Sequence, residues 1–116
     1  MTKPMGAIPA GFEAEDSMLL IGGRRADSLV AEAGDTPLFV YDLDRVTAQV
    51  RRFRAACPGV GLHYAIKANT YASILSHISK LVDGLDVASA GEMAAALESG
   101  TDSGEISFAG PGKRDD

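Results

Sequence analysis

The sequence predicts an α/β fold in which short strands and amphipathic helices alternate along the chain. Strands are expected to begin near residues 62, 85 and 105, so about twenty residues separate each start from the next. This spacing is the length of one strand–helix unit, and consecutive units of this kind form parallel strands with right-handed crossovers. Both a closed barrel and an open, doubly wound sheet fit the pattern, and spacing alone does not decide between them.

Composition limits the classes of function. The 116 residues are 46% hydrophobic and 23% charged, which is typical of a globular chain, and the net charge is -5. No basic surface for nucleic acid or for an anionic membrane is therefore expected. The aliphatic run at residues 18–21 is far shorter than the roughly 20 residues of a membrane span. A lone cysteine, Cys57, fits a reducing compartment, so we expect a cytoplasmic protein with a small-molecule ligand.

The amino-terminal part is expected to hold an arm and three short elements. Two prolines and two glycines interrupt residues 1–17, which predicts a flexible arm before a partial α/β domain over residues 18–116. The three elements are a strand at residues 18–21, a helix at residues 26–33 with Gly34 as its C-cap, and a strand at residues 38–41 (Leu-Phe-Val-Tyr), which include β-branched and aromatic side chains.

Residues 43–56 carry the clearest helical pattern. The apolar residues Leu43, Val46, Val50 and Phe53 follow one another at spacings of 3, 4 and 3, so they share one face of a helix. The arginines of this segment lie mostly on the other faces and are expected to be in solvent.

The remaining units continue to the end of the chain. Strands are expected at residues 62–66, 85–88 and 105–109, with helices at residues 71–82 and from residue 90 to Gly100. Asn69 or Thr70 can cap the first of these helices. Ser89 and Glu92 have the spacing of a capping box at the start of the second.

Three polar groups follow the ends of these strands: Lys67, residues 86–89 and the Gly-Pro-Gly loop at residues 110–112. The carboxyl ends of parallel strands share one edge, so we expect these groups to converge there. Lys67 stands in an otherwise apolar run, and burial favours the neutral amine that a Schiff-base lysine needs. Asp86 is expected to form a buried pair with Lys67.

Each candidate also has a purely structural interpretation. Taken alone, Lys67 could be a surface lysine at a strand end, and Asp86 could be a solvated acid. The capping box with Ser89 explains Glu92 without any chemistry. His63 lies on the opposite face of its strand from Tyr64 and is expected to be structural.

Four motifs carry a family resemblance. They are residues 36–44 (TPLFVYDLD), 63–69 (HYAIKAN), 86–92 (DVASAGE) and 108–113 (FAGPGK). In this order and spacing, they resemble the amino-terminal part of the pyridoxal-phosphate-dependent diaminopimelate/ornithine/arginine decarboxylases, which are alanine-racemase-like barrel enzymes. The leader and the last motif are also similar to the exosortase-associated decarboxylase subgroup. The resemblance implies about three βα units of a (β/α)8 barrel, with an amino-terminal strand that would join a carboxyl-terminal β domain.

The resemblance also implies a cofactor and the residues that hold it. The cofactor is pyridoxal 5'-phosphate, which acts as an electron sink during decarboxylation. Lys67 corresponds to the lysine that binds it as a Schiff base, and Ala65 would line its pocket. Asp86 and Glu92 correspond to acids near this lysine that position it or tune its protonation. The parent enzyme is expected to be a homodimer that decarboxylates a small amino acid of the diaminopimelate or ornithine type.

Because a (β/α)8 barrel takes roughly 250 residues, we expect this chain to be an amino-terminal fragment that is inactive alone. Three alternatives remain open: an amino-acid racemase with the same barrel and lysine, a non-catalytic pyridoxal-phosphate-binding protein, and one segment of a split barrel. The family's ring-stacking histidine, phosphate-binding loop and later motifs do not occur in the sequence, so it does not identify the substrate.

Overall fold

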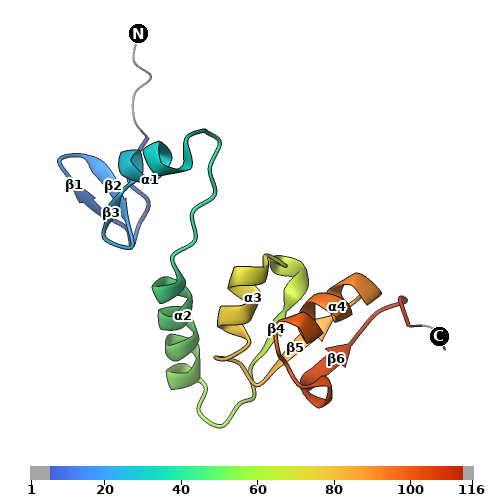
Figure 1. The fold of residues 1–116 in the computed structure, drawn as a ribbon. Helices are drawn as coiled ribbons and strands as arrows, with labels where there is room; N and C mark the ends of the chain where they lie inside the picture. The colour runs from blue at the N-terminus through green and yellow to red at the C-terminus, as the bar shows by residue number, and fades with distance from the viewer. Residues whose placement is uncertain (1–5, 114–116) are drawn as a thin grey trace. The chain divides into compact units, whose positions relative to one another are not determined.

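A computed structural model describes residues 6–113, which form parts of two compact units (Figure 1). The first unit extends to Asp42 and the second begins at Leu43.

The first unit is a small antiparallel sheet followed by one helix. Its strands are β1 (Glu13–Glu15), β2 (Met18–Ile21) and β3 (Arg24–Arg25), in that order, and its helix is α1 (Ala26–Ala33). The predictions of β2 and α1 are confirmed. Gly34 has a φ of 84° and donates its N–H to the Val30 carbonyl, as expected of a C-cap.

Two segments of this unit differ from the prediction. Strand β1 lies in the segment expected to be a flexible arm, of which residues 1–5 lie outside the described residues. It is exposed and pairs with β2 through its backbone, so no hydrophobic alternation marks it. The strand predicted at residues 38–41 is wrong, because no described strand pairs with this segment and Phe39 is 82% exposed. Strand-forming side chains do not make a strand without a neighbouring backbone.

The second unit alternates helices with a parallel sheet. In chain order it contains α2 (Leu43–Ala56), β4 (His63–Ala65), the 3₁₀ turn η1 (Ile66–Ala68), α3 (Ala72–Ile78), β5 (Gly84–Val87), α4 (Ala90–Glu98), the 3₁₀ turn η2 (Ser103–Glu105) and β6 (Ile106–Phe108). The strands lie in the order β4-β5-β6 and both pairs are parallel (Figure 1). This arrangement confirms the predicted α/β class and its three consecutive parallel strands.

Helix α3 and strand β4 are shorter than predicted. The N–H groups of Leu81 and Val82 both donate to the Ile78 carbonyl, so the chain continues after α3 as a turn. Strand β4 ends at Ala65, where the chain enters η1. The Asn69 side chain accepts the Tyr71 N–H at 2.9 Å, but Tyr71 is the N-cap of α3 and no side chain caps this helix, so the predicted cap by Asn69 or Thr70 is wrong.

The hydrophobic core lies between the parallel sheet and its helices. Its buried members are Ile66, Leu75, Ile78, Leu85, Val87 and Ala96. Burial of each large aliphatic side chain stabilises the fold by about 1.5–3 kcal/mol relative to exposure. Leu85 and Val87 alternate with Gly84 and Asp86 along β5, so the other face of the sheet carries small and polar residues. We call this second surface the open face.

Helix α2 is anchored by polar contacts at both ends. Thr47 Oγ1 lies 2.8 Å from Nε2 of His77 on α3. Arg54 pairs with the Asp83 carboxylate at 3.1 Å and donates to the Leu81 carbonyl, so this arginine is not simply a solvated side chain. The same carboxylate accepts the Leu62 N–H at 2.7 Å, which ties the helix to the start of β4.

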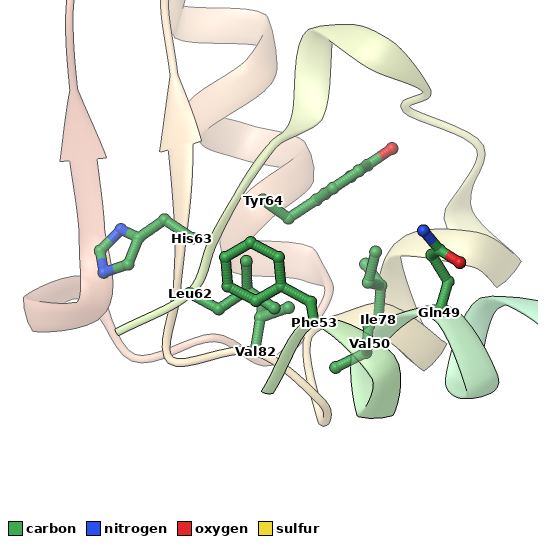
Figure 2. A pocket seen from close by; sticks show the side chains of 8 residues that line it. All are labelled: Gln49, Val50, Phe53, Leu62, His63, Tyr64, Ile78 and Val82. Carbon is green, nitrogen blue, oxygen red and sulfur yellow. The ribbon is translucent and has the colours of Figure 1, made fainter. Parts of the chain in front are cut away.

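An apolar groove of about 190 Å³ lies beside the amino end of β4 (Figure 2). Its lining residues are Gln49, Val50, Phe53, Leu62, His63, Tyr64, Ile78 and Val82. The residues predicted to bind a ligand follow the carboxyl ends of the strands, so this groove at the amino end of β4 is not the predicted site. Figure 2 also shows the His63 ring directed away from the apolar cluster, on the other side of β4 from Tyr64.

Candidate active site

Lys67 lies in η1, directly after the carboxyl end of β4. Its side chain is exposed, so the predicted burial is wrong in this chain. The neighbouring Ile66 is 0% exposed and takes the core position, and the 3₁₀ turn leaves Lys67 outside. Among the described residues, the Lys67 amine has no hydrogen-bond or ion-pair partner. The turn thus presents a primary amine at the edge of the sheet.

Asp86 lies on the open face of β5 but does not pair with Lys67, so the expected buried pair of these two residues is wrong. Its Oδ1 lies 3.2 Å from Nδ1 of His63 on β4 and accepts a hydrogen bond from the Ser107 hydroxyl on β6. The Ser107 hydroxyl, and after it the His63 ring, lower the pKa of Asp86 against the opposing effect of partial burial. The carboxylate is therefore held in its charged form by the two neighbouring strands.

Gly84 allows the His63 ring to reach Asp86. His63 and Gly84 are partners in the parallel register, and a Cβ on Gly84 would lie 2.6 Å from Cε1 of the ring. Real Cβ atoms essentially never approach another atom so closely, so a side chain here would displace the ring. The absence of a side chain at Gly84 leaves the path from His63 to Asp86 open.

The sequence did not predict the contacts of His63 and Ser107 with Asp86. The available signal was strand alternation, which places each of them on the same face as Asp86 once the register is known. Parallel register depends on packing between strands and helices, so the linear sequence did not reveal this contact.

Ala65 and Glu92 occupy different places around Asp86. Ala65 is the register partner of Asp86 on β4 and is half-buried, so β4 presents only a methyl group at this register position. Glu92 Oε2 accepts the Ala88 N–H at 2.8 Å, and the Glu92 N–H donates to Ser89 Oγ at 3.1 Å. The Ser89 contact of the predicted capping box is confirmed, whereas the Glu92 carboxylate accepts the N–H of Ala88, one residue before the N-cap Ser89.

The loop at residues 110–112 lies against the end of β5. A Cβ on Gly112 would stand 2.9 Å from the Ala88 carbonyl oxygen, and one on Gly110 would stand 3.9 Å from the Ala88 Cβ. The Ala109 N–H also donates to the Val87 carbonyl at 2.9 Å. The expected meeting of the segments after β5 and β6 at one edge is therefore confirmed.

Two other features are absent from residues 6–113. This part of the chain has no cluster of three or more His, Cys, Asp or Glu side chains that could hold a metal ion. It also contains no helix of sufficient length and apolar character to span a membrane.

The sheet, the lysine after β4 and the acidic residue on β5 define an α/β domain with a candidate site at the carboxyl edge of its parallel sheet. Residues 43–116 match the family described as pyridoxal-dependent decarboxylase, pyridoxal binding domain. This match covers more than half of the chain, and the chain belongs to that family.

Relatives and solved structures agree with this assignment. The diaminopimelate decarboxylase of Neisseria meningitidis serogroup B is 37% identical over 86 residues, which are 72% of this chain and 21% of that protein. The crystal structure of AQ1208 from Aquifex aeolicus has a TM-score of 0.81 and 32% identity, over 89% of this chain and 26% of that one. Diaminopimelate decarboxylase from M. jannaschi has a TM-score of 0.69 and 30% identity, over 85% and 24% respectively. The chain thus spans about a fifth to a quarter of the length of the proteins it matches.

Proposed function

We propose that this chain is the lysine-bearing part of a pyridoxal-phosphate-dependent amino-acid decarboxylase. The observation that carries the proposal is the position of Lys67. A chain of the pyridoxal-binding family presents this amine, without a competing partner among the described residues, at the carboxyl edge of a parallel sheet. That edge is where sheets built from βα units place their active sites.

The residues around Lys67 fit an aldehyde cofactor with a charged ring. Lys67 supplies the amine that would hold the cofactor covalently, and bound pyridoxal phosphate supplies the electron sink for decarboxylation. Asp86 contributes a fixed negative charge on the open face, and Ala65 beside it leaves space. Glu92 holds the Ala88 backbone at the start of α4, so its part in the site is to shape the edge of the sheet.

The complete activity is proposed for a longer protein. The chain spans 21% of its Neisseria relative, and a (β/α)8 barrel requires roughly 250 residues. We therefore expect the 116-residue chain to release no carbon dioxide alone. The substrate proposed for the longer protein is an amino acid of the diaminopimelate type, with ornithine as the next candidate. That enzyme is proposed to be a cytoplasmic homodimer.

Covalent labelling of Lys67 tests the proposal. The chain is incubated with pyridoxal phosphate, reduced with borohydride and analysed by peptide mass spectrometry. Label should concentrate on the peptide that contains Lys67 and disappear from it in Lys67→Ala. Lys80 is an exposed lysine after α3 and serves as the internal control. Equal labelling of Lys67 and Lys80 would mean that only exposure determines the reaction, and the proposal would fall.

Carbon dioxide release from diaminopimelate and ornithine tests the reaction class. A protein that carries this chain together with the remainder of the barrel should release carbon dioxide from one of these amino acids. Racemisation without release of carbon dioxide would instead identify the racemase alternative.

A further inference from the structure

Three consecutive strands each contribute one polar side chain to the same place on the open face. His63 comes from β4, Asp86 from β5 and Ser107 from β6. Asp86 and Ser107 are register partners, whereas His63 reaches Asp86 diagonally across Gly84. The three side chains form one hydrogen-bonded group, which we call the open-face cluster.

Both contacts in the open-face cluster use the same oxygen of Asp86. The His63 ring and the Ser107 hydroxyl meet Oδ1, and Oδ2 has no hydrogen-bond partner among the described residues. An ionised carboxylate only accepts hydrogen bonds, so His63 must carry its proton on Nδ1 in this contact. Two donors from opposite sides fix the rotation of the carboxylate, because it cannot turn without breaking one of them.

The side chain of Asp86 remains 43% exposed despite these contacts, so solvent reaches this carboxylate. Its register partner Ala65 is the last residue of β4, and Lys67 follows two residues later. The free acceptor therefore stands one strand away from the segment that carries the amine.

We infer that His63 and Ser107 are positioning residues that hold Asp86 with its Oδ2 free to accept a hydrogen bond from the Lys67 amine or from the ammonium group of a bound amino acid. This inference rests on the proposed function, because it assigns a role in the same site. It also explains why a histidine and a serine stand on a sheet face that contributes no side chain to the buried core.

Pairs of substitutions at His63 and Ser107 test whether the hydrogen bonds to Asp86 are required, or only a side chain at these positions. His63→Leu and Ser107→Ala remove the donors. His63→Asn and Ser107→Thr keep an N–H or a hydroxyl close to its original place. Thr47→Val is the matched control, since it removes a hydrogen bond on the helix layer, away from the cluster.

Two readouts are made on the whole 116-residue chain. In a carbon-13 NMR titration, His63→Leu and Ser107→Ala should each raise the pKa of Asp86 toward its usual value. The same variants should slow labelling of Lys67 by pyridoxal phosphate about tenfold, the effect expected for loss of a charge-assisted hydrogen bond. His63→Asn and Ser107→Thr should keep the Asp86 pKa and the labelling rate of Lys67 near those of the wild type. Thr47→Val should change neither.

The outcomes distinguish this inference from the proposed function. Normal labelling of Lys67 in the His63→Leu/Ser107→Ala double variant would overturn the inference and leave the proposed function intact. Failure of His63→Asn and Ser107→Thr to restore labelling would also overturn it. If the wild-type chain is not labelled at Lys67, both fall together, and the Asp86 titration then shows only that the cluster is a structural contact.

Discussion

At the scale of single residues, the contrast between Ile66 and Lys67 shows how a reactive group is separated from the core. Ile66 is 0% exposed and packs with Leu75 and Leu85, whereas Lys67 is in solvent. In this 3₁₀ turn, Ile66 therefore contributes to the stability of the core, and the adjacent Lys67 remains available for chemistry. A substitution at Lys67 should leave the core intact, so loss of its label in Lys67→Ala can be interpreted chemically.

The capping box predicts different effects for Ser89 and Glu92. Ser89→Ala should lower the free energy of unfolding by about 1 kcal/mol, because the Glu92 N–H loses its side-chain acceptor. Ser89→Asp keeps an acceptor and should lose little. Glu92→Gln keeps an amide oxygen for the Ala88 N–H, so its urea midpoint should stay near that of the wild type. If Glu92→Gln nevertheless weakens labelling of Lys67, the charge of Glu92 acts in the site as well as in the cap.

Asp83 predicts loss of stability in acid. Its hydrogen bond from Arg54, and then that from the Leu62 N–H, lower the pKa of the carboxyl group below its usual value. A lowered pKa in the folded state adds stability above the unfolded pKa, and this stability disappears as the pH falls through the folded pKa. The urea midpoint should therefore fall below about pH 4, and the fall should be smaller in Asp83→Asn. An identical acid dependence in both proteins would contradict this assignment.

At the scale of elements, Gly84 predicts how tightly β4 and β5 are joined. Gly84→Ala places a Cβ against the His63 ring and the Glu105 carbonyl, so it should cost about 1–3 kcal/mol and disturb the open-face cluster. Gly61→Ala is the control, because no described atom lies within 4 Å of the position of its Cβ. Thermal unfolding of the two variants measures the difference. Equal stability would show that the strands shift apart without cost.

The elements differ in how well the sequence predicted them. Helix α2 has the predicted bounds because a spacing of 3 and 4 residues is a local pattern that needs no partner. The capping box of α4 is equally local. Residues 38–41 lack the predicted strand, and the Lys67–Asp86 pair is absent, because both depend on which strands meet in space. The sequence thus predicted which chain segments form the candidate site, but it did not predict which side chains contact Asp86.

At the scale of the whole chain, the division at Asp42 predicts where a protease acts first. Phe39 is 82% exposed and lies outside every helix and strand. Chymotrypsin should therefore cut after Phe39 before it cuts after Phe53 or Tyr64, which lie in α2 and β4. Mass spectrometry of a short digest identifies the fragment that starts at residue 40. Phe39→Ser should delay this cut, and first cleavage inside α2 would contradict the prediction.

The alternation along β5 also bears on how such a domain can change over time. Leu85 and Val87 are constrained by volume, since a smaller side chain leaves a cavity and a larger one does not fit. Asp86 lies between them but is constrained only by its hydrogen-bond partners and by any group that binds beside it. One short strand thus carries two sets of positions under different physical constraints, so a substitution that changes the binding properties of the open face can leave the packing beneath it intact.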